Sequence, residues 1–402
     1  MTVPTTTAPP AAAATTSAPT ATPATTSAPT ATRNTASGLI ASGPLGVLVA
    51  NFGPNWFASV MGTGIVATAA VSLPVHLPGL RLLGVASWAL AVVLLIAVSV
   101  ATVLHWRRHP RTARRHHLDP VMAHFYGAPP MALMTVGAAT LLAGRDVIGE
   151  TAALAVDWTL WTAGTIGGLL TAIAIPYLQF TRHDNTERAA FGGWLMPVVP
   201  PMVSASTGAL LLPYLPEGQP RLTLLVACYA MFGLSLIASF LVIPQIWQRL
   251  TTGDVGPARL VPTLWIVLGP LGQSITAANL LGGVAHLALP PSYADPLRAL
   301  GLIYGIPVLG FALLWIALAA AITIRTARSH LPFTLTWWSF TFPVGTCVTG
   351  TSALAAHTGS TMLAAAATVL YAALLTAWAV VATRTTGAAL RGTLVLPSPA
   401  HS

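Results

Sequence analysis

One stretch of the sequence, residues 333–352 (FTLTWWSFTFPVGTCVTGTS), combines an apolar composition with polar residues at helical spacing. At 100° per residue, Ser339, Phe342, Thr346 and Thr349 fall on one face of a helix. Such a stripe on a membrane helix faces protein or a water-filled path, because lipid cannot satisfy its hydrogen bonds. Phe342 is the one large ring on this face, and an apolar ring closes such a path by excluding water. We therefore predict that Phe342 is a pore gate; the alternative is an ordinary packed aromatic.

The composition indicates an all-α integral membrane protein. Of 402 residues, 54% are hydrophobic and only 7% are charged, whereas soluble domains carry about 25% charged residues. The chain has 18 arginines, no lysine and 9 acidic residues, and the arginines lie between apolar segments rather than in an arm that could bind nucleic acid. Cys228 and Cys347 lie inside apolar segments, and no CxxC or HExxH motif is present. We expect no disulfide framework, no metal and no cofactor.

Three regions follow from the distribution of residue types. Residues 1–45 are rich in Ala, Thr, Pro and Ser, and TTSAPTAT occurs in them twice. Such a composition cannot bury a core, so we predict a disordered cytoplasmic tail. We expect a membrane domain at 50–385 and a short cytoplasmic tail at 386–402.

The membrane domain divides into apolar segments of about 20 residues, each long enough to span a hydrocarbon core of about 30 Å. We predict ten transmembrane helices, at 55–73, 82–104, 121–143, 155–178, 191–212, 222–247, 261–287, 299–324, 333–355 and 361–383.

The arginines predict the orientation of these helices. Fourteen arginines lie in the tail before the first segment or after even-numbered segments, and four lie after odd-numbered segments. Cytoplasmic loops are enriched in positive residues, so both termini are expected in the cytoplasm of a multi-pass plasma-membrane protein.

A repeat is visible in the prolines. Pro130, Pro200 and Pro270 are spaced by 70 residues, Pro343 follows after 73, and Pro201 doubles the second of them. All lie in odd-numbered segments, where proline frees a carbonyl and bends a helix. We predict five helical hairpins, each with a proline-kinked odd helix facing a shared central axis and a straight even helix facing lipid.

Polar residues follow the same division. The odd segments place small and polar residues on single faces, and ordinary helix packing is the alternative explanation for each face. We predict the following pore-lining or anion-contacting residues: Ser59, Gly62, Thr63, Ser204, Gln273, Thr276, Ser339, Thr346 and Thr349.

The chemistry that is missing from these segments narrows the function. No acidic residue or arginine lies clearly at mid-membrane depth; Asp157, His124 and His286 are near segment ends, where a structural role is expected. Paired carboxylates, a Ser/His/Asp set and a phosphate-binding glycine loop are absent, so an enzyme is not expected. A pore of hydroxyls, amides and helix ends in a basic protein suits a small anion.

Five stretches of the sequence resemble one family of membrane proteins. The chain is similar, over about 50–385, to the tellurite-resistance/dicarboxylate transporter family, which includes fungal malate permeases, sulfite efflux pumps and the slow anion channels of plant guard cells. The resemblance is carried by PNWFASVMGTGIVA (54–67), DPVMAHFYGAPPMAL (119–133), LMPVVPPMVSASTGALL (195–211), LWIVLGPLGQSITAANLLG (264–282) and WWSFTFPVGT (337–346).

The resemblance implies five helical hairpins around a central pore, a homotrimer with one pore per subunit, and a plug formed by an aromatic residue at the position of Phe342. The expected cargo is a C4-dicarboxylate such as malate, or sulfite. A proton-coupled symporter of these anions and a chloride or nitrate channel remain as alternatives. Outside this class, the alternative is a membrane-embedded enzyme or sensor without transport.

Overall fold

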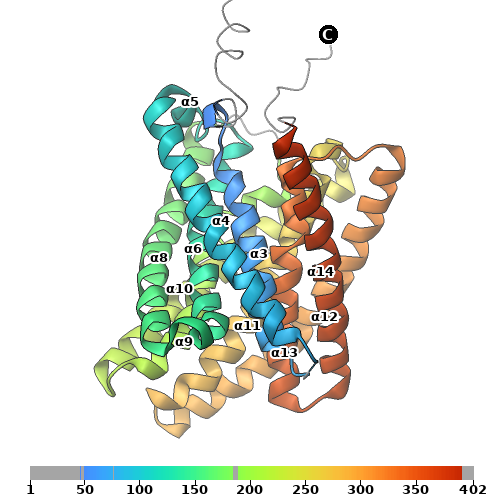
Figure 1. The fold of residues 1–402 in the computed structure, drawn as a ribbon. Helices are drawn as coiled ribbons and strands as arrows, with labels where there is room; N and C mark the ends of the chain where they lie inside the picture. Colours follow the sequence, from blue (N-terminus) through green and yellow to red (C-terminus); the bar gives the residue numbers. More distant parts are fainter. Residues whose placement is uncertain (1–45, 47–48, 76, 184–188, 392–402) are drawn as a thin grey trace, which may run out of the picture. The chain divides into compact units, whose positions relative to one another are not determined.

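The computed structural model describes residue 46 and residues 49–75, 77–183 and 189–391. The described residues are almost entirely helical and contain no β-strand, and their helices run side by side (Figure 1), which confirms the predicted all-α class. The tail predicted at 1–45 and residues 392–402 lie outside this part of the chain.

Five long helices carry most of the exposed apolar surface. In the most apolar 18-residue stretch of each of these helices, only 22–33% of the residues are buried. Ile173, Ile303 and Met362, which lie on these helices, are at least 70% exposed. A surface of this kind suits lipid, because soluble proteins rarely expose large contiguous apolar areas. The long helices are α4 (Leu80–Arg108), α8 (Glu150–Thr181), α10 (Gln219–Thr252), α12 (Pro291–Ser329) and α14 (Thr361–Leu390).

Five shorter helices are almost wholly buried, and each is preceded by a 3₁₀-helical segment. The short helices are α3 (Phe57–Ser72), α6 (Ala128–Ala139), α9 (Pro200–Leu211), α11 (Leu268–Val284) and α13 (Phe342–Thr358). The segments before them are η1 (Pro54–Trp56), η2 (Met122–Gly127), η4 (Gly192–Leu195), η6 (Ala258–Val267) and η8 (Leu335–Phe340).

The prolines of the repeat lie where the 3₁₀-helical segments give way to α-helix. Pro200 and Pro201 open α9, Pro343 is the second residue of α13, and Pro130 and Pro270 are the third residues of α6 and α11. The first turn of an α-helix tolerates proline because its N–H groups have no partner within the helix. The prolines predicted to kink helices therefore lie in the first turns of α-helices, and the kinks themselves stay a prediction.

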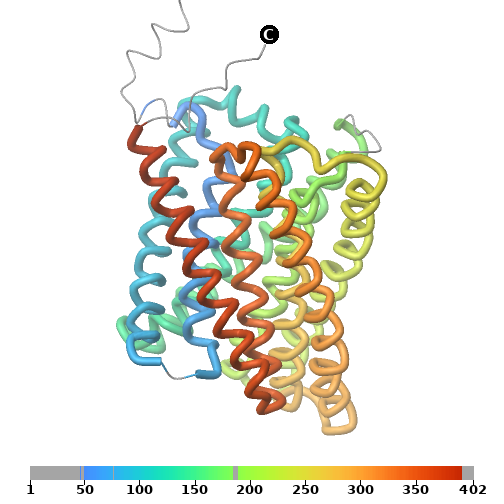
Figure 2. Tube along the Cα trace, turned by 90° about the vertical axis from the view of Figure 1, so that its right-hand side faces the viewer, coloured from blue at the N-terminus to red at the C-terminus, as the bar shows by residue number. Residues whose placement is uncertain are grey.

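The short helices contact one another in a closed ring. In chain order, α3 packs against α6, α6 against α9, α9 against α11, α11 against α13, and α13 again against α3. Each also packs against the long helix that follows it, as the neighbouring α13 and α14 show in Figure 2. The ring thus places α3 beside α13, although the two helices are far apart in the sequence.

By length and composition, seven helices in the described part could cross a membrane. Two of them contain short helices, joined to their flanking turns: Met122–Ile148 and Ala258–Leu287. The three remaining short helices, α3, α9 and α13, are not among the seven. They have 16, 12 and 17 residues, and at 1.5 Å per residue even 17 residues reach only about 26 Å, less than the hydrocarbon core of a bilayer.

The remaining elements are short turns at the two ends of the helices. They are α5 (Pro110–Arg115), η3, a π-helical turn (Thr140–Gly144), α7 (Arg145–Ile148), η5 (Leu212–Tyr214) and η7 (Ala285–Leu287).

Glycine allows two helices of the ring to approach each other closely. A Cβ atom added to Gly272 of α11 would lie 2.4 Å from the backbone nitrogen of Cys347 in α13. Small residues permit such backbone approaches between membrane helices. This contact fixes how α11 and α13 present their side chains to the interior of the ring.

Candidate functional site

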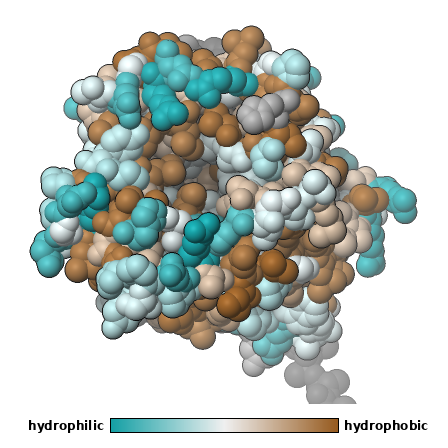
Figure 3. Space-filling model, turned by 90° about the horizontal axis from the view of Figure 1, so that it is seen from below, coloured by the Kyte–Doolittle hydropathy of each residue, from teal (hydrophilic) through white to brown (hydrophobic). Residues whose placement is uncertain are grey.

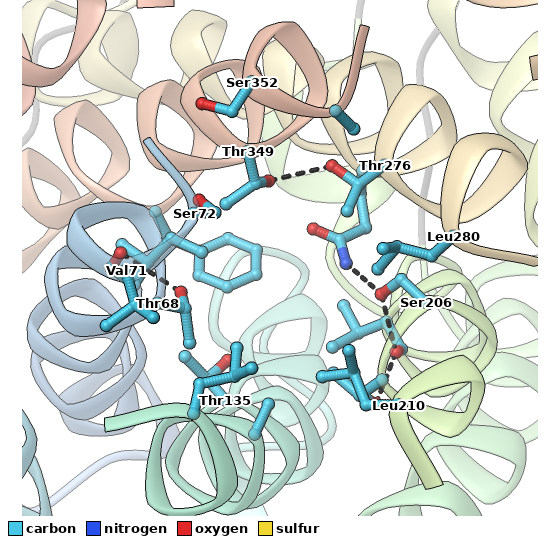
Figure 4. Close-up of a pocket in the computed structure, with 18 of the residues that line it drawn as sticks. Thr68, Val71, Ser72, Thr135, Ser206, Leu210, Thr276, Leu280, Thr349 and Ser352 are labelled. Atoms are coloured by element: carbon cyan, nitrogen blue, oxygen red, sulfur yellow. Dashed lines mark hydrogen bonds between the residues drawn. The ribbon is translucent and has the colours of Figure 1, made fainter. Parts of the chain in front are cut away.

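The ring of short helices encloses a cavity of about 270 Å³. Each of the five helices contributes to its wall, which joins hydroxyl and amide groups to apolar side chains, and Figure 4 shows labelled members of the wall around a shared space. The cavity is lined by Ile65, Thr68, Val71, Ser72, Thr135, Ala138, Leu142, Val203, Ser206, Thr207, Leu210, Gln273, Thr276, Leu280, Phe342, Thr349, Ser352, Ala353 and Ala356.

The cavity is open at the end where the short helices terminate. Its lining residues near those termini, Leu142, Leu210 and Leu280, are partly exposed, and Ala356 is exposed. Viewed from this end, the space-filling surface has a hollow near its middle with hydrophilic side chains close to it (Figure 3). Phe342, at the other end of the cavity, is only 3% exposed. The cavity is therefore open at one end and closed at the other by the phenyl ring of Phe342.

Phe342 also lines a second, much smaller cavity of about 20 Å³. A water molecule needs about 10–15 Å³ of such space, so the second cavity holds about one. Its wall comes from the beginnings of the short helices and is mostly apolar: Ala58, Met61, Phe125, Met131, Met196, Val199, Ile266, Gly269, Ser339, Phe342 and Pro343. The side chain of Phe342 thus adjoins a wide compartment on one side and a narrow, apolar one on the other.

Gln273 supplies the amide group of the larger cavity. Its Nε2 donates to Ser206 Oγ and links α11 to α9. An amide nitrogen carries two N–H donors, and among the described residues only Ser206 accepts from this one. The second N–H is available to a ligand inside the cavity.

Hydroxyl groups supply the other polar contacts. The Oγ1 atoms of Thr276 and Thr349 are 2.8 Å apart and join α11 to α13, while Thr207 Oγ1 donates to Val203 O at 2.7 Å within α9. A hydroxyl rotates about its C–O bond, so these groups can turn a proton toward an anion. No ionisable side chain is among the described residues that line the cavity. A cavity of this kind has a low affinity for an anion, because no full charge attracts it.

Some of the predicted pore-lining residues meet at the cavities. Phe342, Gln273, Thr276 and Thr349 line the larger cavity, and Ser339 lines the smaller one.

The other predicted pore-lining residues line neither cavity, and most of them contact neighbouring helices. Thr63 accepts a hydrogen bond from Trp378 of α14 at 3.1 Å, and Ser204 Oγ is 3.1 Å from Thr165 Oγ1 of α8. A Cβ added to Gly62 would meet Thr341 and Trp338, and Ser59 Oγ donates to Trp56 O. Thr346 Oγ1 is 2.7 Å from Pro343 O and 3.2 Å from Leu268 O of α11.

Six polar residues of the larger cavity were missed by the sequence reasoning: Thr68, Ser72, Thr135, Ser206, Thr207 and Ser352. A signal for two of them exists in α9, where Val203, Ser206, Thr207 and Leu210 form an i, i+3, i+4, i+7 stripe. The sequence reasoning selected the neighbouring face, which contains Ser204.

The ionisable residues weighed from the sequence lie away from the cavity wall. Asp157 is fully buried at α6, where an added Cβ on Gly137 would lie 2.5 Å from its Oδ1 atom. The ring of His124 stacks on Trp194, with ring centroids 6.2 Å apart, and His286 is exposed. In the described part, no group of three or more His, Cys, Asp or Glu residues is placed to hold a metal ion.

Together, the apolar long helices and the uncharged, hydroxyl-lined cavity fit a membrane transport protein. The chain belongs to the voltage-dependent anion channel family, whose model matches residues 51–386. It is therefore a membrane anion transporter.

Curated relatives of the chain include named transporters. The chain is 27% identical over 312 residues to a sulfite efflux pump of Trichophyton rubrum, covering 76% of this chain and 82% of the relative. It is 28% identical to an uncharacterized transporter of Methanocaldococcus jannaschii, over 75% of this chain and 83% of that protein. A malic acid transport protein of Schizosaccharomyces pombe is 20% identical, over 75% and 70% of the two chains.

Proposed function

We propose that the protein conducts small anions, sulfite or a C4-dicarboxylate such as malate, through a central pore that Phe342 gates. The observation that carries this proposal is the position of Phe342, which lines both the 270 Å³ cavity and the 20 Å³ cavity. The small compartment has an apolar wall and room for about one water molecule, so an anion would lose most of its hydration there. Phe342 is the side chain whose movement would join the two compartments.

The proposed architecture is ten transmembrane helices arranged as five hairpins. Its support is the closed ring of α3, α6, α9, α11 and α13 and the packing of each against the following long helix. In this arrangement the 3₁₀-helical segments complete the crossing of the short helices, and the exposed long helices face lipid.

The choice of cargo rests on the relatives and on the cavity wall. The names of two relatives specify sulfite and malic acid, and both are small oxyanions that hydroxyl and amide donors can solvate. The wall offers hydroxyl and amide groups and no fixed positive charge, which favours rapid passage over tight binding.

The proposed location is the plasma membrane, with both termini in the cytoplasm. The basic α5 lies at the end of the molecule where α3 begins and α14 ends (Figure 1). Positive residues concentrate in cytoplasmic loops, so the open end of the larger cavity would face outward.

The proposed assembly is a homotrimer with one pore per subunit, and this part rests on the family resemblance alone. Native mass spectrometry of the detergent-purified protein is expected to give three times the mass of the chain. A monomer mass in several mild detergents would contradict it.

The function is tested with purified full-length protein in liposomes. Flux of sulfite, malate, succinate, nitrate and chloride is measured with and without a pH gradient. We expect sulfite or malate to move down its own gradient without a pH gradient. Flux of the anion against its own gradient, driven by a proton gradient in the same direction, would instead identify a proton-coupled symporter. Flux of nitrate and chloride alone would identify a channel for inorganic monoanions. Flux of none of them would overturn the proposal.

A further inference from the structure

Beside the open end of the larger cavity, a histidine and an arginine flank one buried amide. Asn279 of α11 is 8% exposed and lies one turn beyond the cavity residue Thr276. His357 lies one residue after Ala356, the exposed cavity residue of α13. The Nδ1 atom of His357 is 3.1 Å from Asn279 Oδ1. The pair thus bridges α11 and α13 at the edge of the cavity.

The hydrogen bonds of Asn279 determine which imidazole nitrogen carries the proton. Asn279 Nδ2 donates to Ile275 O at 2.9 Å and to Gly301 O at 3.1 Å, which uses both of its N–H groups. Its Oδ1 is an acceptor, so the imidazole must donate from Nδ1. Nε2 is then the nitrogen that takes up a proton from water, and the Asn279 carbonyl supports the resulting cation.

Arg298 lies on the same turn of α12 that Asn279 contacts. A Cβ added to Gly282 of α11 would lie 3.0 Å from the Cα of Arg298. Burial, and after it the positive charge of Arg298, lower the pKa of His357, so the second charge, on His357, develops only at acidic pH. Arg298 is exposed and has no ion pair or hydrogen bond within the described part of the chain.

The other arginines at this end of the molecule have acidic neighbours. Arg81 pairs with Asp146, and Arg221 is 3.5 Å from Glu217. Arg145 and Glu150 both lie close to Tyr214. Arg298 thus differs from Arg81 and Arg221 in forming no ion pair within the described residues.

The other elements around His357 bring no opposing charge to it. The side chains of α14 from Thr361 to Thr383 and those of α3 are all uncharged. On α12, Asp295 is exposed one turn before Arg298 and forms no ion pair within the described residues. On the α11 side, His286 is exposed and bonds to the carbonyl of Gly283 in its own turn.

We propose that Arg298 and His357 form an anion-recruitment site at the open end of the cavity, with His357 as its pH-dependent member. This inference rests on the proposed function, because it assumes that anions pass through this cavity. Since the cavity wall is uncharged, a positive edge raises the local anion concentration where an anion enters or leaves. Arg298 supplies a permanent charge, and His357 adds a second charge as the pH falls.

The test compares variants in proteoliposomes with equal pH on both sides, from pH 5.5 to pH 8. The transported anion is sulfite, or malate where the wild type carries only malate. Flux of each variant is divided by wild-type flux at the same pH, because this ratio cancels the protonation of the anion itself. Correct assembly of each variant is verified by size-exclusion chromatography.

We expect the ratio for His357→Gln to be about one third at pH 5.5 and to approach one at pH 8, since a unit charge at short range in water alters occupancy several-fold. The ratio for His357→Arg should be near one at pH 5.5 and about threefold at pH 8. His286→Gln, the matched control, should stay at one throughout. Arg298→Gln should lower flux at every pH, and high salt should reduce the difference.

A His357→Gln ratio that does not change with pH would overturn this inference, whatever its value, because a purely structural histidine would give that result. Wild-type flux with such a constant ratio leaves the proposed function standing. An absence of wild-type flux for both anions would remove the proposed function, and this inference with it.

Discussion

At the scale of single residues, the surroundings of Phe342 differ from those of a phenylalanine packed in a core. A buried phenylalanine in a core is surrounded by side chains that lose contacts when it is truncated. Phe342 instead adjoins space on two sides, in the larger and the smaller cavity. Its removal would join the two spaces rather than create an isolated void.

We expect Phe342→Ala to raise anion flux per folded protein by about fivefold or more, because it removes the apolar ring that excludes water from the path. The measurement is liposome flux normalised to the yield of assembled protein. The control is Phe232→Ala: Phe232 is 9% exposed on α10 and lines neither cavity. Its truncation should cost about 3–5 kcal/mol of stability and leave flux no higher. Poor expression and reduced flux of Phe342→Ala would identify Phe342 as a core residue.

Two threonines of α13, one turn apart, separate cavity lining from helix packing. Thr349→Val removes a hydroxyl from the cavity wall and is expected to lower flux about threefold or more, since the anion loses a donor worth about 0.5–1.5 kcal/mol. Thr346→Val removes a contact to the α11 backbone and is expected to lower stability by about 1 kcal/mol without changing flux per folded protein. Liposome flux and thermal unfolding are measured for both variants. Equal flux for the two would indicate that the Thr349 hydroxyl does not meet the anion.

At the scale of elements, the sequence indicated the helices better than it indicated their faces. The apolar segments and the in-phase prolines gave the alternation of buried and exposed helices, because burial and proline position leave a direct record in residue type. Gln273, Thr276 and Thr349 were found because a polar residue at membrane depth must meet protein or water. The same rule does not say which of the two it meets.

Ser204 and Thr346 show this limit. Both are polar and lie at helical spacing, yet they contact neighbouring helices, whereas Ser206, two positions from Ser204, lines the cavity. The rotation of a helix about its axis is set by its partners, and these are distant in the sequence. The 3₁₀-helical segments also could not be predicted, because their sequences are as apolar as those of the α-helices that follow.

The contact between α11 and α13 is expected to depend on Gly272. Gly272→Ala would push a Cβ against the Cys347 backbone and should lower stability by about 1–3 kcal/mol or more. The control on the same helix is Gly283→Ala, because Gly283 has nothing within 4 Å of an added Cβ and alanine favours the helix by about 1 kcal/mol. The melting temperature of the detergent-purified protein is measured for both. A Gly272→Ala variant as stable as wild type would show that the two helices can separate without cost.

At the scale of the whole molecule, charge is distributed unequally between the two ends. Five arginines lie between Arg107 and Arg115 and are exposed, next to the end of α4. The two ion pairs among the described residues join Arg81 to Asp146 and Arg221 to Glu217, at the other end of the molecule. This asymmetry fits a protein inserted in one direction.

The orientation is tested by cysteine labelling in intact cells with a membrane-impermeant reagent. Cys228 and Cys347 are buried, so the background should be low. Thr112→Cys on α5 is expected to react only after permeabilisation, whereas Ser292→Cys at the start of α12, which is exposed, should react in intact cells. The opposite pattern would reverse the orientation.

The single open end of the larger cavity gives the protein a built-in sidedness. An anion that carries a bulky aromatic group could enter from the open end and would be stopped at Phe342, whereas from the other side it would meet the 20 Å³ constriction first. We expect an arylsulfonate to block only from the side that faces the open end of the cavity. The block should be stronger when the membrane potential drives the arylsulfonate into the cavity. In planar-bilayer recordings with a blocker on one face at a time, the conductance would then behave as a rectifier whose polarity reports which end of the molecule faces the blocker.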